Sequence, residues 1–164
     1  AKVSRLAQPF ATDKETGKPI TLLDVTVPQK NDAGGAGSAS TIGDYARFCQ
    51  MLLNGGQLDG VRILGRATVA YMTSDHLDTI KPAIPTLQPG DGFGLGVAGR
   101  KGGGVNSTSG SAGEYNWGGA AGTGFWVDPK EQLVAIMMTQ PVPGPAQRFD
   151  RALFRHAVYQ AIVD

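Results

Sequence analysis

Apolar residues recur with a helical period in three parts of this chain. Residues 41–53 are predicted to form a helix, because Thr41 and Asp44 have the spacing of a capping box and a broad apolar face follows. An Asn-Gly-Gly sequence then ends that helix. A shorter helix is predicted over residues 66–73 and a closing helix over residues 146–163. The apolar stripe of the closing helix consists of Phe149, Leu153, Phe154, Ala157, Val158 and Ile162.

A period of two marks the strands in the second half of the chain. Apolar residues alternate with glycine over residues 92–97, which predicts one strand with a bare face that another element can approach closely. Further strands are predicted over residues 113–119, 122–127 and 133–140. The segment 128–132 has the length of a hairpin connection between the last two strands. The last strand is apolar on both faces, as in a strand covered on both sides.

Residues 1–40 are polar and interrupted by proline and glycine. They predict loops with one short extended piece, Ile20–Val27. Helices grouped apart from an antiparallel meander predict the α+β class, an antiparallel sheet with flanking helices. Because the first forty residues look poorly suited to cover that sheet, we expect that a segment packing on it lies outside this chain.

Composition and charge exclude several classes of partner. The chain has 164 residues, enough for one domain with a real core. Its 15 Lys and Arg residues balance 14 Asp and Glu residues, so it lacks the basic surplus of a nucleic-acid-binding protein. Its longest apolar run, residues 133–138, is too short to span a bilayer. We therefore expect no nucleic-acid partner and no membrane span.

The sequence contains no pattern that indicates a metal site or a cofactor site. The single cysteine, Cys49, is expected to be a small core residue and not a nucleophile. It forms no cluster of metal-ligand spacing with His76 or His156. Residues 94–99 match a dinucleotide-binding fingerprint in letters, yet no helix is predicted after them, so a glycine-faced strand is the better interpretation. We expect no metal and no cofactor.

Residues suited to acid–base or nucleophilic catalysis are scattered. The chain contains neither a Ser-x-x-Lys box nor a Gly-x-Ser-x-Gly elbow. The acidic residues Asp44, Asp91, Glu114 and Asp128 form no obvious catalytic pair. His156 is expected to be a surface or half-buried helix residue. A Ser/His/Asp triad stays open on sequence alone, because triads are recognised by geometry.

The segment 113–129 is the most informative stretch. Two aromatic ends bracket a centre of glycine and alanine. Small residues at the end of a strand leave backbone N–H groups within reach of a ligand, which is how main chain can build an oxyanion hole or a carboxylate cradle. The alternative is a glycine-rich turn between two strands.

Two blocks of residues resemble the serine β-lactamase and penicillin-binding-protein superfamily, and most closely its class-C-like (family VIII) carboxylesterases. The first block runs from Gly34 through the helix at 41–53 to Gly56, and the second runs from Trp117 to Pro129. The resemblance implies a partial β-lactamase/DD-peptidase-like fold. Residues 1–164 would then be a single C-terminal segment of a larger domain. Residues 1–90 would be loops and helices of the helical region, and residues 91–164 the sheet strands and the C-terminal helix.

The second block contains the counterpart of the family's third active-site motif, usually Lys-Thr-Gly or Lys-Ser-Gly. Trp117 takes the position of the lysine, Gly118 that of the hydroxyl residue and Gly119 that of the glycine. The resemblance makes the Ala120 backbone N–H an oxyanion donor, and Trp117, Gly118, Gly119 and Tyr115 substrate-binding residues. A tryptophan and a glycine supply neither charge nor hydroxyl, which favours uncharged esters.

The family's nucleophile box and its Tyr-x-Asn motif are both absent. The chain opens at Ala1 without an initiator methionine or a signal-peptide pattern, so we expect an internal start. The resemblance implies a serine hydrolase that acts through an acyl-enzyme on a small-molecule ester or amide. Its nucleophile would lie in a missing N-terminal half, in the same protein or on a separate chain. The alternatives are a β-lactamase or D-Ala-D-Ala peptidase, and a non-catalytic binding or interaction domain.

Overall fold

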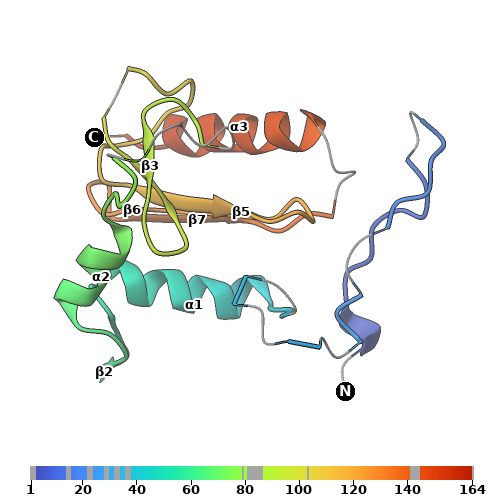
Figure 1. Cartoon of the computed structure of the whole chain (residues 1–164), viewed down its shortest axis with the longest axis horizontal. Coiled ribbons are helices and arrows are strands. Elements are labelled where there is room, and N and C mark those ends of the chain that lie inside the picture. Colours follow the sequence, from blue (N-terminus) through green and yellow to red (C-terminus); the bar gives the residue numbers. More distant parts are fainter. Residues whose placement is uncertain are drawn as a thin grey trace.

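A computed structural model describes residues 3–13, 16–21, 24–27, 30–31, 34–35, 38–78, 80, 87–102, 104–140 and 145–163. Its elements are η1 (Val3–Arg5), α1 (Ile42–Leu53), β1 (Gln57–Leu58), β2 (Val61–Arg62), α2 (Arg66–Thr73), β3 (Asp91–Phe93), β4 (Ala98–Arg100), β5 (Tyr115–Gly118), β6 (Gly124–Asp128), β7 (Leu133–Met137) and α3 (Pro145–Gln160). Figure 1 shows three layers, with the main sheet between α1 and α3.

The main sheet is a five-stranded antiparallel meander with the order β3-β4-β5-β6-β7. In the register of β5 and β6, Trp117 pairs with Phe125 and Asn116 pairs with Trp126. Successive side chains of a strand point to opposite faces, and registered partners share a face. This alternation separates two sets of residues, one facing α1 and the other facing α3.

The two faces of the sheet differ in chemistry. On the α1 side, Tyr115 and Val127 are buried in an apolar core with residues of α1 and α2, namely Cys49, Met51, Leu52 and Val69. On the α3 side, the Trp126 ring packs against Phe154 and Tyr159 of α3, and Arg155 of the same helix stands 4.7 Å from the centre of its ring. The hydrophobic core of the described residues is therefore on the α1 side.

The predicted α+β class and antiparallel meander are confirmed, and so are the helices at 42–53 and 66–73. The side chain of Thr41 caps α1, because its Oγ1 atom accepts a hydrogen bond from the Asp44 N–H at 3.2 Å. The hairpin connection between β6 and β7 is also confirmed.

The single strand predicted over residues 92–97 is wrong. The chain turns back there as a hairpin between β3 and β4, and the Gly94 N–H donates to the Val97 carbonyl at 2.8 Å. Gly96 has φ +95°, a conformation that favours glycine and makes the reversal possible. Alternating glycines permitted a turn as well as an extended strand. No helix follows the fingerprint-like residues 94–99, as predicted.

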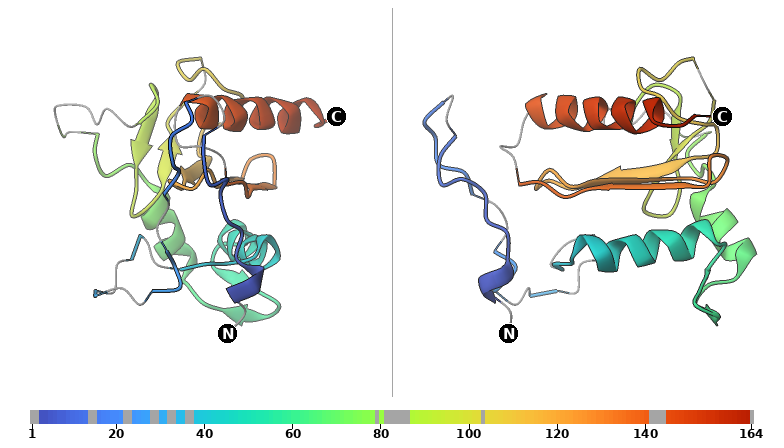
Figure 2. Two further views of the ribbon diagram at one scale, coloured as in Figure 1. Left: turned by 90° about the vertical axis from the view of Figure 1, so that its right-hand side faces the viewer. Right: turned by 180° about the vertical axis from the view of Figure 1, so that it is seen from behind.

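Part of the extended piece predicted at Ile20–Val27 is also wrong. Residues 24–27 form a turn, in which the N–H and hydroxyl of Thr26 donate to the Asp24 carboxylate. Residues 22 and 23 of that piece lie outside the described residues. The described residues before 38 run beside the layered body and cover neither face of the sheet (Figures 1 and 2). Instead α1 packs on β6 and β7, and α3 lies over the opposite face.

The apolar stripe predicted for the closing helix is confirmed only in part. Its member Phe154 packs edge-to-face on Trp126 of the sheet, at 5.6 Å between ring centroids. Leu153 is 58% exposed and Ile162, just beyond α3, is 40% exposed, whereas Arg155 is 8% exposed. Besides Phe154, α3 presents the edge formed by Arg151, Arg155 and Tyr159 to the sheet, where they meet a backbone carbonyl and two carboxylates. Within the described ranges no helix has the length and apolar character needed to cross a membrane.

Cys49 lies in the apolar core and provides a test of the fold. Its side chain has no exposed surface, and burial raises the pKa of the thiol to about 12. Only the thiolate is a good nucleophile. We expect iodoacetamide at about pH 8 to leave the native chain unmodified and to alkylate the urea-unfolded chain fully, as measured by intact mass. Native alkylation at the unfolded rate would contradict this burial.

Candidate functional site

The end of β5 holds the residues predicted to form the site. Trp117 is 40% exposed, and its ring makes an edge-to-face contact with Phe93 at 5.0 Å between centroids. Its registered partner Phe125 contacts Tyr45 of α1, so the Trp117 side chain belongs to the α1 side of the sheet. Two aromatic residues thus form an accessible apolar surface at this end of the sheet.

A tight turn follows directly after β5. The Gly119 N–H donates to the Thr123 carbonyl at 2.9 Å, and the Gly122 N–H donates to the Gly119 carbonyl at 3.1 Å. Ala120 lies in this turn and is exposed. The proposed oxyanion donor therefore comes just after the strand and not within its ladder.

Arg151 of α3 lies across the α3 side of this strand end. Its Nη2 atom donates to the Gly119 carbonyl at 2.6 Å. A Cβ atom on Gly118 would lie 2.5 Å from Nη1 of Arg151, and one on Gly124 would lie 3.5 Å from its Cδ atom. The guanidinium therefore occupies space that a Cβ atom on Gly118 would enter, whereas a Cβ atom on its registered partner Gly124 would make an ordinary contact.

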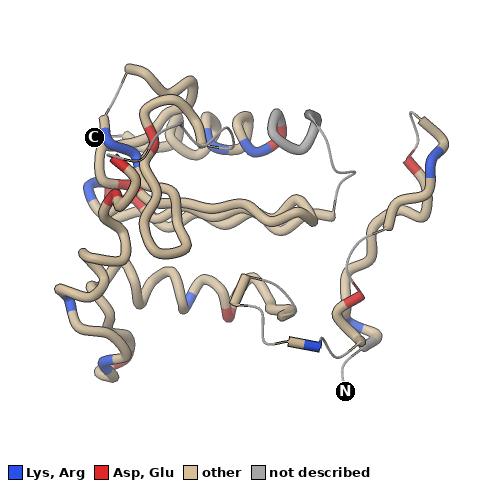
Figure 3. The backbone as a smooth tube through the Cα atoms, viewed as in Figure 1, with Lys and Arg blue, Asp and Glu red and all other residues tan. Residues whose placement is uncertain are grey.

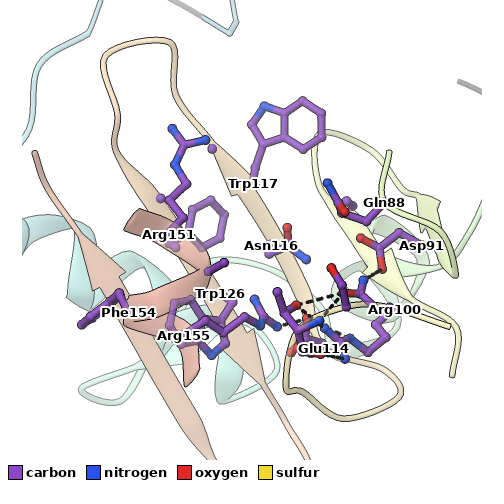
Figure 4. Close-up of a pocket in the computed structure, with 18 of the residues that line it drawn as sticks. Gln88, Asp91, Arg100, Glu114, Asn116, Trp117, Trp126, Arg151, Phe154 and Arg155 are labelled. Carbon is purple, nitrogen blue, oxygen red and sulfur yellow. Dashed lines mark hydrogen bonds and ion pairs between the residues drawn. The ribbon is translucent and has the colours of Figure 1, made fainter. Parts of the chain in front are cut away.

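A cavity of about 560 Å³ lies beside this strand end, mainly on the α3 side (Figure 4). Trp117 and Gly118 line it, together with Asn116, Trp126 and Arg151. Figure 4 shows Arg151 and Trp117 at one end of the cavity and Glu114 at the other. Gly119 and Ala120 are not among its lining residues.

The structure places Tyr115 away from this cavity. Its side chain is buried, with 3% exposed surface, in the core on the α1 side. Burial raises the pKa of its hydroxyl to about 12. The five predicted site residues lie close together in sequence, within positions 115–120, yet the cavity brings together only Trp117 and Gly118.

Sequence reasoning missed a buried ion cluster at the other end of the cavity. Glu114, whose side chain is 1% exposed, forms an ion pair with Arg155 and lies 3.4 Å from Nε of Arg100. Nη1 of Arg100 also donates to the Thr108 carbonyl at 2.8 Å, and Nε of Arg155 donates to the Ser109 carbonyl at 2.6 Å. Charged residues gather at this end of the sheet (Figure 3).

The Tyr159 hydroxyl lies between two carboxyl groups, 2.7 Å from Oδ2 of Asp128 and 3.0 Å from Oε2 of Glu114. Burial raises the pKa of Glu114, against the opposing effect of the Arg155 and Arg100 guanidiniums. Burial also acts to raise the pKa of Asp128, but hydrogen bonds from Tyr159 and from backbone N–H groups outweigh it and hold the pKa below its ordinary value. A spacing of four residues from Arg151 through Arg155 to Tyr159 was the signal that could have revealed this edge of α3.

A serine and a histidine do meet in the structure. Ser109 Oγ lies 3.1 Å from Nδ1 of His156, and both residues are partly buried, as we expected for His156. Among the described hydrogen bonds, no carboxylate contacts the His156 ring, so the third member of a triad is absent from that part of the chain. The described residues also hold no group of three His, Cys, Asp or Glu side chains that could bind a metal ion.

The fold and the strand-end motif define a class of protein. A family profile described as beta-lactamase matches residues 3–160, and the chain belongs to this family. Its relatives include the Mycobacterium tuberculosis proteins Rv1367c (strain H37Rv) and MT1414 (strain CDC 1551), which is called uncharacterized. Each is 35% identical over 131 residues, which are 73% of this chain and 31% of the relative. The chain therefore spans about a third of the length of the curated relatives it matches.

Solved structures of the same fold cover most of the chain. Simvastatin synthase (LovD) from Aspergillus terreus has a TM-score of 0.68 at 21% identity, over 93% of this chain and 42% of that protein. EstCE1, described as a hydrolase with promiscuous acyltransferase activity, has a TM-score of 0.64 at 25% identity, over 93% and 39%. A beta-lactamase from Mycobacterium bovis has a TM-score of 0.55 at 24% identity, over 74% and 44%. The predicted partial β-lactamase-like fold is confirmed.

Asp128 provides a stability test of the buried cluster. We expect Asp128→Asn to lower the free energy of unfolding at pH 7 by about 2–3 kcal/mol, because it weakens charge-assisted hydrogen bonds from Tyr159 and the backbone. The pKa of Asp128 is lower in the folded chain than in the unfolded chain, where it is about 3.9. The ionised carboxylate therefore stabilises the folded state above about pH 3.9, and this contribution is lost as the pH falls through the folded-state pKa. The difference from wild type should therefore shrink below about pH 4.

Urea denaturation at pH 7 and pH 3 measures this difference. Asp59→Asn is the matched control, because Asp59 pairs with Arg47 on the exposed surface and should contribute less than about 1 kcal/mol. Equal destabilisation by Asp128→Asn at both pH values would contradict the ionised state of Asp128.

Proposed function

We propose that this chain is the C-terminal part of a serine hydrolase that cleaves uncharged esters through an acyl-enzyme. Within the beta-lactamase family, the observation that favours an ester is the exposed Trp117 at the position of the motif lysine, next to Gly118 at the position of the hydroxyl residue. In this proposal the segments 1–90 and 91–164 contribute the helical region and the sheet region of one larger domain.

The apolar surface at the end of β5 supports an uncharged substrate. Trp117 and Phe93 present two aromatic rings in contact there, and the nearby Arg151 guanidinium is engaged by the Gly119 carbonyl. EstCE1 is described as a hydrolase with promiscuous acyltransferase activity, and it shares this fold over 93% of the chain. Transfer of an acyl group to water or to another acceptor is the common chemistry that we propose.

Ala120 would supply one backbone donor to the oxyanion that forms when the ester carbonyl is attacked. Its exposure and its place directly after β5 agree with that role. The attacking serine would lie on polypeptide outside this sequence, which contains no Ser-x-x-Lys box. Loss of one oxyanion donor costs about 10²–10³ in rate, whereas loss of the nucleophile removes the covalent route.

The 164-residue chain alone should not hydrolyse p-nitrophenyl butyrate above the buffer rate, and the complete protein should. An esterase rate from the chain alone would contradict the proposal that the nucleophile lies elsewhere. A complete protein that cleaves neither an ester nor nitrocefin would favour the alternative of a non-catalytic binding domain. Nitrocefin cleavage without ester cleavage would favour a β-lactamase or D-Ala-D-Ala peptidase.

In the complete protein, Trp117→Ala should lower kcat/KM for the butyrate ester about tenfold more than for the acetate ester, because it removes apolar contact with the longer acyl chain. Tyr71→Ala is the control, since Tyr71 is an exposed aromatic residue of α2 at 62% exposure. An equal loss on both esters would show that Trp117 does not contact the acyl chain.

A further inference from the structure

We propose that Arg151 is a positioning residue that sets the direction of the Ala120 backbone N–H. The inference deepens the function proposed above, because it concerns the same oxyanion donor. Nη2 of Arg151 donates to the Gly119 carbonyl at 2.6 Å. That carbonyl and the Ala120 N–H belong to one peptide unit, so a contact that holds the oxygen also holds the N–H.

The geometry of the peptide unit gives the direction of the Ala120 N–H bond. A trans peptide unit is planar, and its C=O and N–H bonds point in opposite directions. Arg151 reaches the Gly119 oxygen from α3, so the Ala120 N–H points away from the guanidinium. The Trp117 side chain also lies on the side of the sheet away from α3. The amide and the indole thus belong to one accessible region at the end of β5.

The guanidinium approaches the strand closely at Gly118 and makes an ordinary contact distance at Gly124. A Cβ atom on Gly118 would lie 2.5 Å from Nη1 and 2.8 Å from Cζ of Arg151. Gly124, its registered partner, would place a Cβ atom 3.5 Å from Cδ and Nε of the same side chain. A side chain at position 118 would therefore force the Arg151 guanidinium to move from its observed place.

The charge of Arg151 would also strengthen the donor. A hydrogen bond to the carbonyl of an amide polarises that peptide unit, and linked hydrogen bonds reinforce one another. A preorganised donor of this kind needs no reorganisation when negative charge develops on the substrate oxygen. Arg151 acts through the Gly119–Ala120 peptide and does not itself contact the reacting atoms in this proposal.

The first experiment reads the amide directly in the 164-residue chain. Arg151→Met keeps an apolar side chain over the two glycines and removes the guanidinium. We expect the Ala120 amide resonance to move in ¹⁵N–¹H spectra, because the peptide unit loses the charged donor on its carbonyl oxygen. Arg47→Met removes an exposed guanidinium on α1 and should leave that resonance unchanged.

The second experiment measures p-nitrophenyl butyrate hydrolysis by the complete protein. Arg151→Met should lower kcat by about 10- to 100-fold, less than loss of the donor itself, with KM changed by less than about threefold. Gly118→Ala should give a similar loss, because its Cβ atom displaces the guanidinium. The double variant should lose little more than either single variant, since both break one contact.

The two experiments separate the two proposals. An unchanged Ala120 resonance in Arg151→Met would overturn the positioning role, whatever the complete protein hydrolyses. Additive losses in the double variant, or a rise in KM without a fall in kcat, would overturn it as well. Absence of esterase activity in the wild-type complete protein would overturn the proposed function, while the resonance shift would still confirm the orientation of the peptide.

Discussion

Long arginine side chains that cross from α3 to the sheet hold the two layers together. Arg155 reaches the buried carboxylate of Glu114, and Arg151 reaches the Gly119 carbonyl at the other end of the same face. Removing one partner of a buried ion pair typically costs about 3–5 kcal/mol, because the other charge stays buried without compensation. The position of α3 over the sheet is therefore set by polar contacts at defined points, and not by an apolar seam alone.

This polar layer has a consequence for the site. The α1 side of the sheet is filled by apolar side chains that pack closely, whereas the α3 side leaves a cavity between the ion cluster and the end of β5. One arginine at each end of that cavity links α3 to the strand. A change in α3 would reach the strand end through Arg151, which connects a helix far along the chain to the turn after β5.

The family relationship agrees with the proposed role of the end of β5. The chain belongs to the beta-lactamase family, whose profile covers residues 3–160. Within that family, the combination of Trp117 with Gly118 replaces charge and hydroxyl by an aromatic surface and open space. Arg151 occupies the space next to Gly118, so we infer that the departure from the usual motif affects the support of the proposed site as well as the side proposed to face a substrate.

Local patterns in the sequence determined the elements and their class. The Thr41 cap and the apolar period predicted α1, and the apolar run at 133–137 predicted β7, because capping and burial act over a few residues. The short connections between β5, β6 and β7 predicted that these strands form an antiparallel meander. The resemblance of the motif at 117–119 was readable for the same reason, since its residues are consecutive.

Tertiary structure alone decided which face of α3 meets the sheet. Leu153 of the predicted apolar stripe is exposed, whereas its neighbour Phe154 packs on Trp126. The edge through Arg151, Arg155 and Tyr159 also faces the sheet, because the residues opposite it include Glu114 and glycines. The face of α3 that packs on the sheet is set by contacts between residues more than thirty positions apart, and the hydrophobic period within the helix does not contain this information. It was likewise packing that buried Tyr115 in the α1 core, left Trp117 exposed, and turned the alternating glycines at 92–97 into a hairpin.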